Sequence, residues 1–433
     1  MNFAYQTYRL LTTVLFLFCL PIFRLAASLS PRHQAVLNQR LGCYAAVRVK
    51  NTGGSPRIWL HAASVGEVGV AKAIMAHLVV SMPDSALILS STTEHGVLFA
   101  REKLGSRVTC VYAPLDFTRC VRKAFGTLQP DILVCIETEI WPNWMITAQK
   151  MGIKTALVNG RISIRSIRRY LYIRPLMKET LKNVDAFSMI RPEDAERIRS
   201  MGADRDKIEV NGNAKYDILP LQADHILKTA LARRYRINDR PVFLAGSTRT
   251  TEENVILDVY QKIIRSFPET ILLIAPRHVE RSGHIQRLVN ERGFSCQLRT
   301  HIDENRPRSA PVVILDTIGE LQATYSIATL VFCGGSLVPR GGQNVLEAAA
   351  WGKLVFYGPS MEDFLDARDL LSRAGGGIEV RDGKDLAEKA IYYLSHPEEA
   401  GRIGRRAKEA IRSHTGAARK HAEVIHRLVR DRG

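Results

Sequence analysis

The stretch IWLHAASVGE, residues 58–67, contains the unit from which the fold is built: an apolar run that ends in a turn. A helical pattern follows over 68–81, and similar apolar runs recur at 86–93, 108–114, 131–137, 154–158, 186–190 and 208–213. Apolar runs that alternate with helical patterns are typical of a parallel sheet covered by helices on both faces. The first half of the chain is therefore predicted to be a doubly wound α/β domain.

A second series of the same kind begins after residue 240. Its predicted strands are 241–248, 270–276, 312–317, 330–336, 354–360 and 377–380. Residues 214–240, which are charged and contain Pro220 and the turn signal Asn238-Asp239, separate the two series. We therefore predict an α/β protein of the GT-B type, in which two Rossmann-like doubly wound domains face a cleft. Sugar epimerases and some synthetases share this architecture, so the fold alone does not choose among them.

The predicted domain boundaries follow these patterns. Residues 1–30 are predicted to form an N-terminal membrane anchor, 31–220 the first Rossmann-like domain and 221–405 the second. Residues 383–430 carry a helical pattern throughout, and 406–433 are predicted to form a C-terminal basic helix able to pack back on the first domain. Ligands of doubly wound sheets bind outside the carboxyl ends of the strands, so the site residues are sought there.

The composition restricts the class of partner. The 433 residues include 61 Lys and Arg against 43 Asp and Glu, which gives a formal net charge of +18 at pH 7 and favours an anionic partner. Hydrophobic residues make up 46% and charged residues 24%, values that exclude a largely disordered chain. The seven cysteines form no Cys-x-x-Cys pair, which argues against a zinc cluster or a disulfide framework and suits a reducing cytosol.

The N-terminus contains an apolar run, LLTTVLFLFCLPIF, at 10–23, between Arg9 and Arg24. The run is shorter than the ~20 residues that cross a bilayer, although flanking residues extend it through Leu29. A cleaved signal peptide is an alternative, but unpaired cysteines suit an oxidising compartment poorly. We predict a retained inner-membrane anchor, spanning or monotopic, with the body on the cytoplasmic side by the positive-inside rule.

A basic stretch lies between 161 and 178 and contains no acidic residue. Its basic residues, interleaved with apolar ones, are Arg161, Arg165, Arg168, Arg169, Arg174 and Lys178. This pattern is typical of an amphipathic helix beside anionic lipid, and a solvated helix face is the alternative. Nucleic-acid binding is not expected, because no zinc-finger, RNP or helix-turn-helix pattern accompanies the stretch.

Carboxylates stand at two predicted strand ends of the first half. For Glu67 two interpretations remain open: a general base that takes a proton from an attacking hydroxyl, or an acid that only complements the helix dipole. Glu137 and Glu139 follow another strand in ETEIWPN, 137–143, where one of them could orient Lys215 or an acceptor hydroxyl. A helix N-terminal role explains Glu139 more readily than Glu137.

The second half carries the signals for a phosphate. Arg277, in APRH at 275–278, supplies a cation at a strand end. After the next strand, the N–H groups of Ile318 and Gly319 could bind a base or a ribose edge.

The Gly-rich loop GGSLVPRGGQN, 334–344, runs into a predicted helix at 345–351, where main-chain N–H groups can approach a phosphate. Glu347, one turn into that helix, suits the hydroxyls of a ribose.

Several signatures are absent from the sequence. It has no P-loop and its first strand lacks G-x-G-x-x-G, which argues against a P-loop ATPase and an ordinary NAD dehydrogenase. Asp204-Arg205-Asp206 matches the D-x-D metal clamp of other glycosyltransferases, but it lies in a predicted surface turn and is interpreted as chance. No metal and no cofactor are expected, because Arg277 and a helix terminus can neutralise a leaving phosphate.

The motifs HAASVGE, ETEIWPN, NGRIS, NGNAKYD, AGST, APRH, DTIGEL and GGQNVLEAAAWG occur in this order. Together they resemble the 3-deoxy-D-manno-octulosonic acid (Kdo) transferases of lipopolysaccharide biosynthesis, glycosyltransferase family 30, over roughly the whole chain. The resemblance implies an inverting, metal-independent GT-B enzyme on the cytoplasmic face of the inner membrane. Its donor would be CMP-Kdo, and its acceptor the 6′-hydroxyl of the lipid A precursor, lipid IVA, beside anionic membrane lipids.

The resemblance also implies roles for site residues: Glu67 as proton acceptor, with Glu137 and Lys215 as stabilisers of the transition state. The implied CMP contacts are Pro276, Arg277, Ile318, Gly319, Glu320, Asn344, Val345, Leu346 and Glu347. The family commonly has His and Pro where this chain has Gln343 and Val345, so no contact by the side chain at 343 is carried over. The alternatives are another GT-B transferase that uses a UDP-sugar and a lipid acceptor, and a non-catalytic membrane scaffold.

Overall fold

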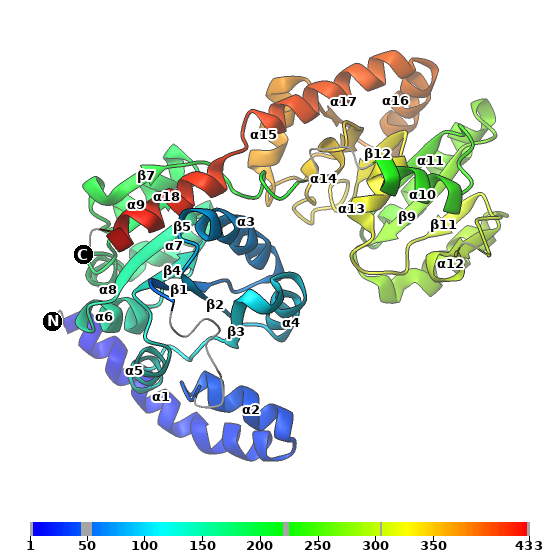
Figure 1. The fold of residues 1–433 in the computed structure, drawn as a ribbon. Helices are drawn as coiled ribbons and strands as arrows, with labels where there is room; N and C mark the ends of the chain where they lie inside the picture. Colours follow the sequence, from blue (N-terminus) through cyan, green and yellow to red (C-terminus); the bar gives the residue numbers. More distant parts are fainter. Residues whose placement is uncertain (1–2, 45–53, 220–224, 304, 431–433) are drawn as a thin grey trace. The chain divides into compact units, whose positions relative to one another are not determined.

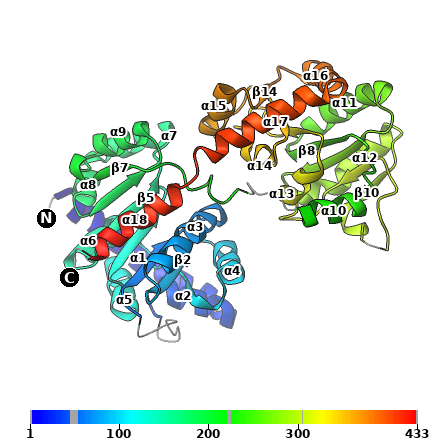
Figure 2. The same ribbon diagram turned by 45° about the horizontal axis from the view of Figure 1, so that its top comes forward.

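The computed structural model describes residues 3–44, 54–219, 225–303 and 305–430. The chain divides into two compact units (Figure 1): unit 1 runs to Ile218 and resumes at His414, and unit 2 runs from Leu219 to Ser413. In the described residues each unit is built on a seven-stranded parallel sheet with helices on both faces (Figure 2). The predicted fold class is confirmed.

The sheet of unit 1 has the strand order β3-β2-β1-β4-β5-β6-β7. The order reverses between β1 and β4, and at such a switch point the carboxyl ends of the strands leave a crevice for ligands. The strands are β1 Arg57–His61, β2 Ala86–Ser91, β3 Val108–Tyr112, β4 Ile132–Ile136, β5 Lys154–Gly160, β6 Ala186–Met189 and β7 Ile208–Val210. All seven were predicted.

Two apolar clusters cover the faces of this sheet. One contains Trp59, Phe125 and Trp144, and the other joins Ile74 of α3 to Ile425 of the C-terminal helix. The helices are α1 Phe3–Ser28, α2 Pro31–Arg40, α3 Val65–Ser81, α4 Glu94–Lys103, α5 Thr118–Leu128, α6 Pro142–Lys150, α7 Ile164–Tyr172, α8 Arg174–Leu181, α9 Pro192–Met201 and α18 Ala417–Arg430. The last helix of the chain is therefore part of the first unit's core.

The sheet of unit 2 has the order β10-β11-β9-β8-β12-β13-β14. Its strands are β8 Val242–Thr248, β9 Ile271–Pro276, β10 Cys296–Leu298, β11 Val312–Ile314, β12 Leu330–Cys333, β13 Leu354–Tyr357 and β14 Ile378–Glu379. Its helices are α10 His225–Arg234, α11 Glu252–Ser266, α12 Ser282–Glu291, α13 Leu321–Thr324, α14 Leu346–Ala349, α15 Leu365–Ala374, α16 Gly383–Ser395 and α17 Pro397–Arg412. The edge strand β10 was not predicted.

Three predicted helices differ in the structure. The basic stretch forms two helices, α7 and α8, because Pro175 has no N–H to continue the first one. The helix predicted at 345–351 is a single turn, α14, since Gly352 at φ +71 ends it before β13. The pattern over 383–430 contains three helices, with breaks before Pro397 and at Gly416, which has φ +95.

The unit boundaries can be compared with the predicted domains. The predicted boundary at 220/221 lies in 220–224, outside the described residues, next to the division at Ile218/Leu219. The predicted boundary at 405/406 falls inside α17, and the chain returns to unit 1 only at His414. Helix α18 packs on α3, β4, β5 and β6 (Figure 1).

Candidate active site

Glu67 lies in the first turn of α3, directly after the carboxyl end of β1. Its Oε2 accepts a hydrogen bond from the Ala63 N–H at 2.7 Å, and its Oε1 accepts one from the Ser64 hydroxyl at 3.0 Å. Ser64 is the N-cap of α3 and accepts in turn from the Glu67 N–H. The carboxylate is thus held in a defined position at the start of α3 by the N-cap residue and the residue before it.

The environment of Glu67 changes its acidity. Burial raises the pKa of Glu67 to about 7, the negative charge of Glu137 adds to this rise, and the bonds from Ala63 and Ser64 oppose it. A general base works best when its pKa lies near the working pH. Raised pKa values of this kind are common at functional sites, so Glu67 is a candidate general base.

Glu137 and Lys215 form an ion pair beside this carboxylate. The Lys215 Nζ lies 2.5 Å from Glu137 Oε1. Glu137 is the first residue after β4 and has φ +59, a left-handed backbone that costs a non-glycine residue energy and that is common at functional sites. The structure therefore brings the three predicted catalytic side chains together at one edge of the unit 1 sheet.

The turn that carries Lys215 is held from two directions. The Ala214 N–H donates to Asn159 Oδ1 at 2.8 Å, at the end of β5. The Asp217 carboxylate accepts from the backbone N–H groups of Gly416 and Ala418 at the start of α18. The C-terminal helix thus helps to fix the position of Lys215.

His61, which the sequence reasoning did not single out, adds a polar group at this edge beside Glu139. The His61 Nε2 lies 3.3 Å from Glu139 Oε2, which also accepts from the Trp141 indole N–H at 2.8 Å. Burial acts to raise the pKa of Glu139, but the bonds from His61 and Trp141 outweigh it, and the pKa is lowered. The side chain of His61 is buried and its Nδ1 lies 2.9 Å from Ser90 Oγ. The sequence signal for His61 was its place at the end of an apolar strand, as the first residue of the motif HAASVGE.

In unit 2, Arg277 follows the end of β9 and Glu347 lies in α14, where the charge of Arg277 acts on it. Arg277 is exposed after Pro276, the last residue of β9, and its N–H donates to the Thr248 carbonyl at 3.0 Å. Burial raises the pKa of Glu347, and the Asn344 amide, 3.3 Å away, and the Arg277 charge oppose this rise. An exposed cation beside a carboxylate suits a ligand that carries both a phosphate and hydroxyl groups.

The third strand end of this unit presents an apolar side chain. Ile318 is 87% exposed, and Gly319 follows it at φ +89. The Glu320 carboxylate is already engaged by Arg299 at 2.7 Å and by the Thr317 hydroxyl at 2.5 Å. This arrangement offers the surface of Ile318 and the backbone to a base, and leaves Glu320 a supporting role.

The Gly-rich loop differs from its prediction. The Glu252 carboxylate accepts four backbone N–H groups, those of Arg249 at 2.8 Å, Gly335 at 2.7 Å, Ser336 at 3.1 Å and Leu337 at 3.0 Å. These groups therefore point at Glu252 and not at a ligand. Because α14 is a single turn, its dipole is also small. Of the predicted phosphate loop and the helix after it, only Asn344–Glu347 remain candidates for contact with a ligand.

Arg249 is a further residue that the sequence reasoning missed. It follows β8, and its Nη1 lies 2.9 Å from His278 Nε2, beside Arg277 in sequence. The signal was present, because the residue comes directly after the strand-end motif AGST. Arg249, Arg277 and His278 together give this edge of the sheet a basic character.

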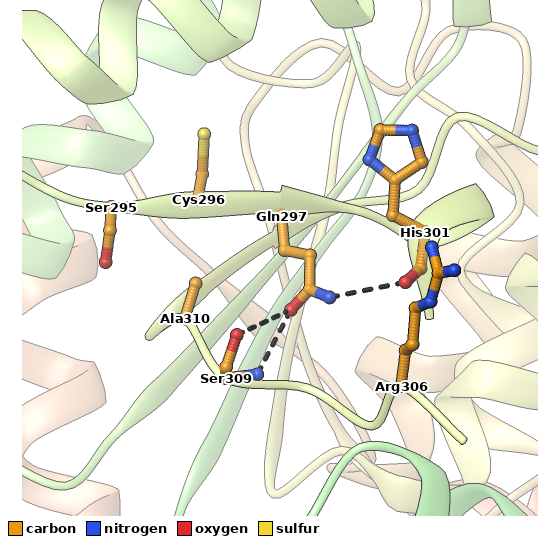
Figure 3. Close-up of a pocket in the computed structure, with 7 residues that line it drawn as sticks. All are labelled: Ser295, Cys296, Gln297, His301, Arg306, Ser309 and Ala310. Atoms are coloured by element: carbon orange, nitrogen blue, oxygen red, sulfur yellow. Dashed lines mark hydrogen bonds between the residues drawn. The ribbon is translucent and has the colours of Figure 1, made fainter. Parts of the chain in front are cut away.

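Two other features lie apart from these residues. Within the described ranges no group of three His, Cys, Asp or Glu side chains is arranged to hold a metal ion, and Asp204 accepts from the Asp206 N–H in a surface turn. A cavity of about 520 Å³ lies at β10 (Figure 3), where Gln297 accepts from the Ser309 N–H at 3.1 Å. It contains none of the predicted site residues, and Gln297 there ties the edge strand to a loop.

Comparison of this chain with known proteins shows which proteins it resembles. Residues 35–218 match the family model described as 3-deoxy-D-manno-octulosonic-acid transferase (kdotransferase), and residues 340–425 match one described as glycosyl transferase-like. A 3-deoxy-D-manno-octulosonic acid transferase of Haemophilus influenzae is 28% identical over 96% of this chain and 98% of its own length. Residues 35–218 therefore carry a Kdo transferase domain, and nearly the whole chain is similar to a Kdo transferase. It is therefore an enzyme, a glycosyltransferase.

Two further proteins are similar to this chain, one in sequence and one in structure. A bifunctional glycosyltransferase/methyltransferase of Fusobacterium nucleatum is 32% identical over 78% of this chain, which spans only 52% of that protein. A glycosyltransferase of Rickettsia africae has a similar structure, with a TM-score of 0.59 and 15% identity over 87% of this chain and 99% of its own. The latter similarity supports the GT-B fold.

Proposed function

We propose that this chain transfers Kdo from CMP-Kdo to the 6′-hydroxyl of the lipid A precursor, lipid IVA, with Glu67 as the general base. One observation carries the proposal: a fixed carboxylate whose pKa is raised to about 7 stands beside the Glu137–Lys215 ion pair. The Kdo transferase domain at 35–218 and the similarity of the chain to Kdo transferases support the choice of sugar.

The proposed reaction is a single displacement. Ionised Glu67 accepts the proton of the 6′-hydroxyl as its oxygen forms a bond to the anomeric carbon of Kdo. The bond from that carbon to the CMP phosphate oxygen breaks, and CMP leaves with the electron pair. Attack opposite the leaving group inverts the anomeric configuration. Lys215, held by Glu137, stabilises the negative charge that develops in this transition state.

We assign donor binding to unit 2. The Arg277 guanidinium holds the CMP phosphate, Glu347 accepts hydrogen bonds from the ribose hydroxyls, and the surface of Ile318 contacts the base. Pro276, Gly319, Glu320, Asn344, Val345 and Leu346 surround these three groups as predicted contacts. The proposal uses no metal, because the Arg277 guanidinium supplies positive charge to the phosphate.

We propose a monotopic association with the cytoplasmic face of the inner membrane. Among the described residues, α1 is the helix long and apolar enough to cross a membrane, and most of its large side chains are exposed. Phe16 nevertheless stacks on Phe117 with ring centroids 4.1 Å apart, and α1 packs on α2 and α8. A helix attached to unit 1 along its length is better suited to lie in the interface than to cross the bilayer.

The product identifies the reaction directly. Incubation of the purified protein with CMP-Kdo and lipid IVA should give a lipid whose mass has increased by one or more Kdo residues. CMP should raise the melting temperature of the protein, whereas UDP and UDP-sugars should not. Stabilisation by UDP and transfer from a UDP-sugar would instead support the alternative GT-B activity.

A further inference from the structure

Two tyrosines of α1 reach from the apolar helix into the polar interior of unit 1. The Tyr5 hydroxyl donates to Asn143 Oδ1 at 3.1 Å, and the Tyr8 hydroxyl donates to Asp116 Oδ2 at 2.6 Å. The side chain of Tyr5 is 1% exposed and packs with Ile146 of α6. Attachment to a lipid surface requires neither hydroxyl, so these bonds need another explanation.

The partners of both tyrosines hold the start of α6. The Asp116 carboxylate accepts the N–H groups of Asn143 and Trp144 at 3.4 and 3.2 Å. These are the second and third residues of α6, whose first N–H groups have no partner within the helix. The Asn143 side-chain amide donates to the Asp116 carbonyl at 2.7 Å and so joins the two tyrosine contacts into one network. Asp116 thus supplies, from another segment, the acceptor for these N–H groups that the N-cap residue of α6 does not provide.

The start of α6 is directly connected to the acid-bearing turn, residues 137–141. The ring of Trp144 lies 4.8 Å from that of His61, and His61 and Trp141 both contact Glu139 Oε2. The Thr138 hydroxyl donates to the Arg161 carbonyl, which fixes the other side of the turn. The N-cap position of α6 is Trp141, so a shift of the helix start moves this turn.

We propose that Tyr5 and Tyr8 are positioning residues for the active site: through Asp116 and Asn143 they fix the start of α6, and with it the turn that carries Glu137 and Glu139. The inference rests on the proposed function for its kinetic readout. Helix α1 then has two parts: the tyrosines lie in its first turns, and exposed apolar residues follow further along it. Exposed Leu11, Leu15 and Phe18 face outward, whereas the two tyrosines hold the catalytic turn.

The test uses the full-length chain with Tyr8→Phe and Tyr5→Phe, which remove a hydroxyl and leave the ring to pack. We expect kcat on detergent-dispersed lipid IVA to fall about three- to tenfold for Tyr8→Phe, with the KM for CMP-Kdo unchanged. Binding to anionic vesicles should equal that of the wild type. Hydrogen exchange at the amides of Asn143 and Trp144 should become faster.

Tyr260→Phe is the matched control. The Tyr260 hydroxyl donates to the Thr270 carbonyl at 2.8 Å, and the side chain is buried in unit 2. Tyr260→Phe therefore removes a tyrosine hydrogen bond like that of Tyr8, but at a site away from α6. This variant should keep the wild-type kcat and the wild-type exchange at Asn143 and Trp144. An equal fall in kcat for Tyr260→Phe would show a general loss of stability and overturn the proposal.

A double-mutant cycle tests the route of the effect. If Tyr8 acts through Asp116, Tyr8→Phe should lower kcat far less in an Asp116→Asn background than in the wild type. If Tyr8→Phe lowered kcat equally in both backgrounds, Tyr8 would not act through Asp116 and the proposal would be overturned. A wild type that transfers no Kdo would instead contradict the proposed function, and the exchange measurement at Asn143 and Trp144 would still decide the role of Tyr8.

Discussion

At the scale of single residues, Glu67 combines a structural bond with a reactive protonation state. Its pKa is raised to about 7, so lowering the pH through 7 protonates the base and should reduce kcat/KM tenfold per pH unit below it. Because the charge of Glu137 contributes to this raised pKa, Glu137→Gln should move the acid limb of the profile to lower pH. In this variant the ammonium group of Lys215, no longer paired with a carboxylate, would also lower the pKa of Glu67. The pH dependence of kcat/KM measures both effects.

A distant acid provides the control for this profile. Glu196 on α9 is exposed and pairs with Arg199, so Glu196→Gln should leave the acid limb in place. An acid limb that is absent from the wild type, or that stays in place in Glu137→Gln, would contradict the assignment of Glu67.

Arg277 is predicted to bind the donor and not to act in the chemical step. Arg277→Ala should weaken CMP binding by about 1.5–3 kcal/mol, the range for a hydrogen bond to a charged group. Arg240→Ala should not, since Arg240 pairs with Glu269 at 2.9 Å elsewhere in unit 2. Calorimetric titration with CMP measures both, and chelators should leave turnover unchanged. An activity lost in EDTA and restored by Mg²⁺ would contradict the metal-free proposal.

At the scale of secondary-structure elements, α7 carries the part of the basic stretch, 161–178, that we assign to the membrane and the lipid acceptor. Arg168 and Arg169 are exposed, as are Leu171 and Tyr172 at the end of the helix. Replacing both arginines with Ser should weaken binding to anionic vesicles by about 2 kcal/mol, less at high salt, and raise the KM for lipid IVA. The KM for CMP-Kdo should stay constant.

The control for α7 removes the same charge from other helices of unit 1. Arg199 and Arg419 are exposed and pair with Glu196 and Glu423. The double variant Arg199→Ser, Arg419→Ser should bind vesicles more tightly than the α7 variant. If the two double variants bound equally, α7 would be an ordinary solvated helix and only the net charge would matter.

The elements also show what a sequence can and cannot reveal. Thirteen of the fourteen strands in the described residues were predicted, most of them because their residues are apolar and buried, whereas β10, three half-buried residues at an edge, was missed. Glu67 was recognised because its place follows from its own strand and helix. Glu252 was not, since its partners at 335–337 lie more than eighty residues away and its position resembles that of any helix N-terminal acid. Contacts of this range depend on the folded sheet.

At the scale of the whole molecule, the residues that we propose for catalysis and for donor binding belong to different units. Glu67, Glu137 and Lys215 lie in unit 1, and Arg277 and Glu347 lie in unit 2. Each set is held by contacts within its own unit, such as the Asp217–Ala418 bond for the Lys215 turn and the Glu252–Gly335 bond for the Gly-rich loop. Glu67→Ala should therefore abolish Kdo transfer and leave the affinity for CMP nearly unchanged.

Calorimetric titration of CMP into the Glu67→Ala chain, beside a transfer assay, separates the two functions. A carboxylate that takes part only in the acceptor step contributes to turnover and not to nucleotide affinity, since no bond to CMP is lost. Arg277→Ala should show the opposite pattern, with weaker CMP binding and turnover recovered at high CMP-Kdo concentration. A parallel loss of CMP affinity and turnover in Glu67→Ala would contradict the division of roles. It would place Glu67 in the donor site and leave the acceptor hydroxyl without a base.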